Sequence, residues 1–174
     1  AKFPFIDVHN HQFGMPDMNL GKLIKDMDKL NMKVMVNLSG ENGESLKKSV
    51  ANVKANFSNR FIVFANVDFK NAGEKDWGEK AAKQLEEDVK SGANGLKIYK
   101  SLGFSVKDIN GKRVTVDDAR LDLVWKKAGE LKIPVIIHTA DPKPFWAPMD
   151  ENNERWLKLN KRPGRKRSDT DPAP

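Results

Sequence analysis

The chain contains three histidines, and two of them are separated by one residue in the segment Phe-Ile-Asp-Val-His-Asn-His. Successive side chains of a β-strand point to opposite faces, so His9 and His11 are expected to project from one face. Neutral imidazoles placed in this way can reach one divalent ion at about 2.0–2.1 Å. The third histidine, His138, follows another apolar run. We therefore predict a metal site, in preference to the alternative that His9 and His11 are merely polar strand-end residues.

Polar side chains also fall in the later half of the other apolar runs, where a purely structural sheet would carry Val, Ile or Ala. They are Asp7, Asn37, Ser39, Asn66, Asp68, Lys97 and Tyr99. Polar groups at the C-terminal ends of parallel strands build the active-site rim of α/β barrels and doubly wound sheets. These side chains are therefore expected to converge on one end of a curved parallel sheet.

Short runs rich in β-branched residues, bounded by Gly, Pro or Asn, predict strands. They are Phe5–His11, Lys33–Ser39, Phe61–Asp68, Gly95–Lys100 and Pro134–Ala140. Helical patterns lie between them, at Leu20–Leu30, Ser45–Phe57, Ala81–Val89 and Leu121–Leu131. Alternating strands and helices predict an α/β fold with a parallel sheet. The segment from Gly103 to Val116, which contains Asn110-Gly111, predicts a hairpin-like excursion over one end of that sheet.

Composition and charge exclude several classes of protein. Apolar residues make up 39% and charged residues 32% of the chain, which is typical of a soluble globular protein with no membrane segment. The net charge is +7, and the segment Lys161–Arg167 alone contains five cationic residues. We interpret this segment as a solvated basic loop rather than as a nucleic-acid-binding surface. The absence of cysteine fits both a cytoplasmic and an exported protein.

Three segments carry a family resemblance. The first-strand segment Phe-Ile-Asp-Val-His-Asn-His resembles the signature of the amidohydrolase superfamily, and Ile-Pro-Val-Ile-Ile-His-Thr resembles the segment in its fifth strand that supplies a further histidine. Gly-Ala-Asn-Gly-Leu-Lys-Ile-Tyr resembles the fourth strand of the amidohydrolase-2 type, which is related to metal-dependent decarboxylases and lactonases. The resemblance covers most of the chain in the expected order.

This resemblance implies a TIM-type (β/α) barrel in which His9, His11 and His138 bind a divalent metal, usually zinc. Lys97 occupies a position where some members carry a carbamylated lysine that bridges two metals, and others carry an electrostatic partner. Asp141 follows the His138 strand and would contact substrate, although Asp141-Pro142 is equally a turn signal. Lys97 and Asp141 are thus the candidate catalytic residues.

The chain departs from the family in length. A full barrel has eight strands and usually about 250 residues, whereas about five strands are predicted here. Residues 1–160 are expected to form the N-terminal part of such a barrel, and residues 161–174 a basic, Pro-rich loop or tail. Members of the family also have a histidine on the sixth strand and a catalytic aspartate on the eighth, and neither has a counterpart in residues 1–174. That aspartate would normally bind the metal and take a proton from the attacking water.

The implied function is metal-dependent hydrolysis of an amide, ester or lactone bond in a small-molecule substrate, by a metal-activated water. A metal-dependent decarboxylase of the same superfamily is the close alternative. A non-catalytic partial-barrel fragment is the second alternative, and its open sheet edges would favour homo-oligomers.

Overall fold

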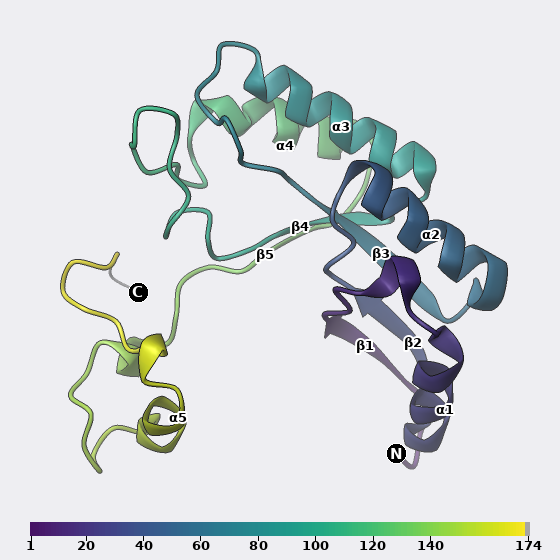
Figure 1. Cartoon of the computed structure of the whole chain (residues 1–174), viewed down its shortest axis with the longest axis horizontal. Coiled ribbons are helices and arrows are strands. Elements are labelled where there is room, and N and C mark those ends of the chain that lie inside the picture. The colour runs from purple at the N-terminus through teal and green to yellow at the C-terminus, as the bar shows by residue number, and fades with distance from the viewer. Residues whose placement is uncertain (173–174) are drawn as a thin grey trace.

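The computed structural model describes residues 1–172 and contains a parallel sheet of five strands in the order β1-β2-β3-β4-β5. The strands are β1 (Phe5–Asn10), β2 (Met32–Asn37), β3 (Phe61–Asn66), β4 (Gly95–Ile98) and β5 (Val135–Ile137). The sheet curls into a half-barrel, so the predicted α/β partial barrel is confirmed (Figure 1). Each strand ends one to three residues earlier than predicted. Several of the predicted site residues therefore lie just beyond the strands.

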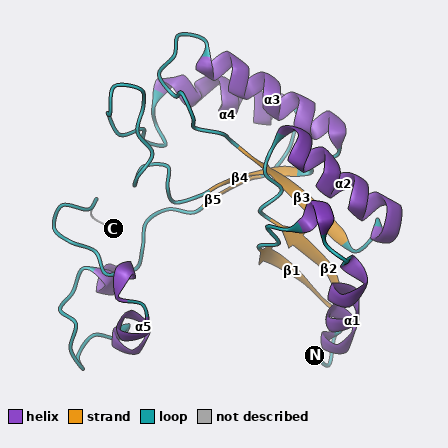
Figure 2. Ribbon diagram, in the orientation of Figure 1, coloured by secondary structure: helices purple, strands orange, loops and turns teal. Residues whose placement is uncertain are grey.

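Helices follow the first four strands and lie along the outer side of the curved sheet (Figure 2). They are α1 (Leu20–Leu30), α2 (Gly43–Phe57), α3 (Trp77–Ser91) and α4 (Asp122–Glu130). Helix α3 begins four residues before the apolar pattern that predicts it. Buried Trp77 starts the helix, and the polar stretch that follows it obscures the pattern.

The hydrophobic core lies between these helices and the sheet. Leu46 of α2, Leu85 of α3 and Val124 of α4 are buried against Leu96 and other strand residues. Burying side chains of this size stabilises the fold by about 1.5–3 kcal/mol each, as an upper estimate. The core therefore holds the sheet in place, and with it the polar residues at the ends of the strands.

The first and last strands are edges of the sheet. Among residues 1–172, strand β1 pairs only with β2, and β5 only with β4. Ile6 and Val8 are more than half exposed, and Ile137 is partly exposed. The register of β1 also shifts between Asp7 and Asn10, which indicates a bulge that interrupts the regular alternation of side chains.

The excursion after β4 is present. Lys107 and Arg113 form an isolated antiparallel bridge, and Gly111 turns the chain at a φ of 78°. Arg120, just before α4, donates hydrogen bonds to Asp108 at 2.9 Å and to Asp118 at 2.8 and 2.6 Å. This ion-pair group attaches the excursion to the start of α4.

The C-terminal segment lies beside the open side of the half-barrel (Figure 1). It contains the short helix α5 (Trp156–Lys161) and a 3-10 turn at Pro163–Arg165, within and next to the predicted tail. Residues 173 and 174 of that tail lie outside the described part of the chain. Within residues 1–172, no helix is long and apolar enough to cross a membrane.

Candidate metal centre

Two asparagines join the ends of neighbouring strands. The Asn37 carboxamide oxygen accepts hydrogen bonds from the backbone N–H groups of Gln12 (2.8 Å) and Ser39 (3.0 Å). The Asn66 amide donates to the carbonyl oxygens of Leu38 (3.0 Å) and Lys97 (3.1 Å). Because buried backbone groups must be paired, these amides replace ladder hydrogen bonds where the strands separate. They hold the C-terminal ends of β1 to β4 together as one rim.

His9 and His11 lie at the β1 end of this rim. Their ring centroids are 5.3 Å apart, and the rings are inclined by 68°. The Asp7 side chain forms hydrogen bonds within its own strand. Its carboxylate accepts from the His9 backbone N–H (3.0 Å) and from the Asn10 side-chain amide (2.8 Å). Asp7 thus stabilises the bulged end of β1.

The His11 ring is held by groups from two other strand ends. Its Nδ1 lies 2.8 Å from Ser39 Oγ, which lies 2.6 Å from the Tyr99 hydroxyl. The rings of Phe13 and Tyr99 both have centroids 5.8 Å from that of His11. With Nδ1 engaged in this way, Nε2 is the nitrogen that remains for a ligand.

His11 and His138 are favoured in their neutral form. Burial lowers the pKa of His11, and His9, Lys97 and His138 lower it further. Burial likewise lowers the pKa of His138, as do Lys97 and Lys100, while Asp141 opposes the shift. A metal ligand must be a neutral imidazole, so these shifts favour the form that binds a metal.

Lys97 is a buried amine at the base of the rim. Its side chain is 1% exposed, and Nζ has no hydrogen-bond partner among the described residues. Burial lowers its pKa. An unpaired buried polar atom is costly, so this nitrogen marks a place where a further polar group fits.

The donor set fits a metal in part. His9 and His11 provide two imidazoles at one strand end, and imidazole nitrogen is a common ligand of zinc. However, within residues 1–172 no group of three or more His, Asp or Glu side chains is close enough to hold an ion. His138 interacts electrostatically with His9 and His11 but does not complete a preformed three-ligand site with them.

Asp141 is engaged by two cations. Its side chain is 5% exposed, and its carboxylate accepts hydrogen bonds from Lys100 Nζ (2.6 Å) and from Arg167 Nε (2.8 Å) and a terminal nitrogen (2.6 Å). Burial raises the pKa of Asp141, but these hydrogen bonds outweigh it and leave the pKa below its ordinary value. The guanidinium of Arg167 also lies over the Phe104 ring at 4.2 Å. In this arrangement Asp141 anchors the C-terminal segment.

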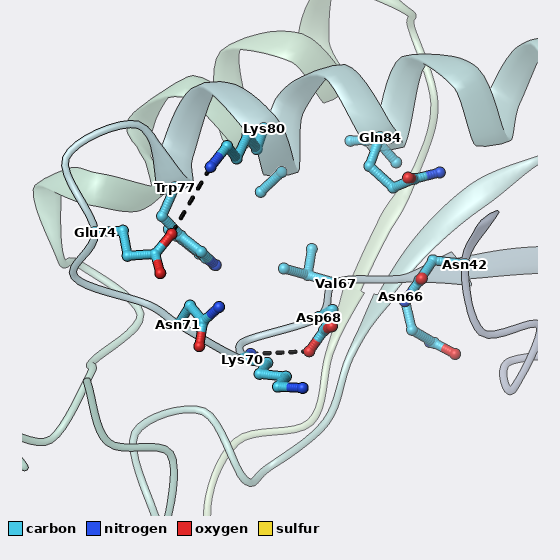
Figure 3. Close-up of a pocket in the computed structure, with 12 residues that line it drawn as sticks. Asn42, Asn66, Val67, Asp68, Lys70, Asn71, Glu74, Trp77, Lys80 and Gln84 are labelled. Atoms are coloured by element: carbon cyan, nitrogen blue, oxygen red, sulfur yellow. Dashed lines mark hydrogen bonds and ion pairs between the residues drawn. The ribbon is translucent and has the colours of Figure 1, made fainter. Parts of the chain in front are cut away.

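Several pockets lie near the rim. One is partly apolar and is lined by His138, Thr139 and Ile137 together with Leu102, Phe104, Val116 and other residues of the excursion. A second pocket, shown in Figure 3, lies between the loop after β3 and helix α3 and has no histidine in its lining. Its Asp68 accepts a hydrogen bond from the Lys70 backbone N–H at 2.8 Å, and Glu74 pairs with Lys80 at 3.7 Å. A third, more open pocket is lined by Phe13, Ser39 and Tyr99 among other residues and has no histidine either. The pocket beside His138 is therefore the one that touches a candidate ligand residue.

Sequence reasoning placed Ser39 and Tyr99 on strand ends without giving them a role. Their position beside His11 depends on the register of β2 and β4 relative to β1. The partnership of Arg167 with Asp141 spans 26 residues, and no local pattern signals it. The unusually polar strand ends were the only signal available for Ser39 and Tyr99.

No family model matches the sequence, and no curated protein matches it. Among solved structures, the crystal structure of 4-oxalomesaconate hydratase from Rhodopseudomonas palustris matches with a TM-score of 0.48 and 18% sequence identity. The match covers 69% of this chain and 37% of that enzyme.

Proposed function

We propose that the chain is the metal-binding part of a metal-dependent hydrolase barrel that cleaves an amide, ester or lactone bond of a small molecule. The observation that carries the proposal is the pair His9 and His11 on a rim of parallel strand ends, with the His11 Nδ1 engaged by Ser39. An imidazole anchored at one nitrogen by a hydrogen bond is the usual state of a metal ligand.

In this proposal His9 and His11 are the first two ligands, and His138 is the third. A bound divalent ion, most simply zinc, supplies Lewis acidity and an activated water. His138 would move towards the pair when the ion binds, because ligands approach a metal to about 2 Å. Lys97, whose burial favours the neutral amine, would place its nitrogen at the base of the same site.

The pocket beside His138 supports a small-molecule substrate. Leu102, Phe104 and Val116 give it apolar walls, and Thr139 adds a hydroxyl. Binding pockets commonly combine apolar walls with a few placed polar groups. An apolar part of the substrate would lie against the excursion while the scissile bond faces the histidines.

Zinc binding tests the metal centre directly. Purified chain, stripped with a chelator and titrated with zinc in a calorimeter, is expected to bind about one ion per chain at pH 7.5. The double variant His9→Ala/His11→Ala is expected to lose this binding, because it removes both nitrogen donors at the β1 end. Circular dichroism should be unchanged, since both side chains lie outside the hydrophobic core.

Phe13→Ala provides a control from the same segment. It removes a ring that stacks on His11 but no donor atom, so zinc stoichiometry should stay at one. Undiminished zinc binding by the double variant would contradict the assignment.

A further inference from the structure

A chain of hydrogen bonds runs from a backbone carbonyl to His11. The Tyr99 hydroxyl lies 3.1 Å from the Leu38 carbonyl oxygen, Ser39 Oγ lies 2.6 Å from that hydroxyl, and His11 Nδ1 lies 2.8 Å from Ser39 Oγ. The participants come from the ends of β1, β2 and β4, so tertiary structure brings them together.

The Leu38 carbonyl determines the direction in which the protons of these hydrogen bonds are donated. A carbonyl oxygen can only accept, so the single Tyr99 proton is donated to Leu38. The Tyr99 oxygen then accepts the single proton of Ser39, and Ser39 Oγ accepts from His11 Nδ1–H. The reverse direction would leave two oxygen acceptors 3.1 Å apart with no proton between them.

Burial keeps this direction in place. Ser39 is 2% exposed, so its hydroxyl cannot exchange partners readily with water. The rings of Phe13 and Tyr99 flank the imidazole and restrict its rotation.

We propose that Tyr99 and Ser39 are positioning residues that fix His11 as the Nδ1–H tautomer, with the Nε2 lone pair free for a metal, before any metal is present. The part of this inference that concerns a metal rests on the proposed function. The assignment of the His11 tautomer does not depend on the proposed function. Pre-setting the tautomer removes a proton rearrangement from metal binding. Hydrogen-bond partners of this type typically contribute 10–100-fold to metal affinity.

The tautomer can be measured without metal. Long-range proton–nitrogen spectra of the metal-free chain, with the histidine rings labelled with ¹⁵N and His11 assigned by its absence in His11→Ala, report which ring nitrogen carries the proton. Wild type at pH 7.5 is expected to show His11 as the Nδ1–H form. Tyr99→Phe removes the donor to Leu38 and frees the Ser39 hydroxyl to donate, so a substantial Nε2–H population should appear.

Zinc affinity provides the second readout. Ser39→Ala should weaken zinc binding about 10-fold or more, and Tyr99→Phe by a smaller factor, in line with the range for such partners. Ser39→Thr retains a hydroxyl and should restore most of the affinity. Ser49→Ala, a change at a buried serine on α2, is the matched control and should leave both tautomer and affinity unchanged.

The outcomes separate the inference from the proposed function. A wild-type His11 that is mainly Nε2–H would overturn the inference. So would a tautomer that does not respond to Tyr99→Phe, or an unchanged zinc affinity in a Ser39→Ala variant whose tautomer has shifted. If wild-type protein shows the Nδ1–H form of His11 but does not bind zinc, the proposed metal site is refuted and the tautomer assignment is supported.

Discussion

At the scale of single residues, hydrogen bonds decide which carboxylates are available for chemistry. Asp7 accepts from the His9 backbone and Asn10, Asp68 from the Lys70 backbone, and Asp141 from Lys100 and Arg167. Each therefore stabilises local or long-range structure. Asp141 in particular links the end of β5 to a residue of the C-terminal segment.

Asp141→Asn is expected to destabilise the chain by about 2 kcal/mol at pH 7. Removing one partner of a buried ion pair typically costs about 3–5 kcal/mol, and the value is smaller here because Lys100 is 36% exposed and screened by water. Urea unfolding of wild type and variant measures the difference. Asp169→Asn, an exposed change in the same region, should be neutral.

The same pair predicts a pH dependence. The folded-state pKa of Asp141 lies below its ordinary value of 3.8, so its contribution is fully present above about pH 5. It declines as the pH falls below about 4 and disappears once the folded-state pKa is passed. The gap in stability between wild type and Asp141→Asn should therefore close in acid. A gap that stays constant from pH 7 to pH 3 would contradict this prediction.

At the scale of elements, close approach of backbones fixes the rim. Gly40 follows β2 and donates its N–H to the Phe64 carbonyl of β3 at 3.1 Å. A Cβ on Gly40 would lie 2.6 Å from Val63 Cγ1 and closer still to the Phe64 carbonyl oxygen. Only glycine allows the loop that carries Ser39 to lie this close to β3.

Gly40→Ala is accordingly expected to destabilise the fold by about 2–3 kcal/mol, at the upper end for overpacking, because a backbone atom cannot yield. Thermal unfolding measures the effect. Gly129→Ala in α4 is the matched control: a Cβ there meets nothing within 4 Å, so this change should stabilise the helix by about 0.5–1 kcal/mol. Equal stability of the two variants would show that the approach of Gly40 to β3 is not tight.

At the scale of the whole molecule, the half-barrel has a candidate metal pair, whereas hydrolysis also needs a positioned base. A general base must lie within about 2.6–3.2 Å of the proton that it removes, and it typically contributes about 10²–10⁴-fold to the rate. The three carboxylates discussed above are already engaged. None of these three is therefore placed to act as the base in the proposed function.

We therefore expect the zinc-loaded chain to show no turnover of small amides, esters or lactones above that of free zinc. Release of a chromogenic leaving group, followed with and without chelator, measures it. Zinc-dependent turnover that is lost in His9→Ala would mean that these residues contain a complete site.

The sequence by itself determined the order of strands and helices, because apolar periodicity is a local property. It also placed polar groups at strand ends, since parallel strands direct their C-terminal ends to one rim. Only the tertiary structure decided how those groups are used. The bulge in β1 depends on pairing with β2, and the contact of His11 with Ser39 and Tyr99 depends on the register of three strands. Likewise, the hydrogen bond between Arg167 and Asp141 joins residues that are 26 positions apart in the sequence. Contacts of this kind follow from packing of distant segments, which no local pattern encodes.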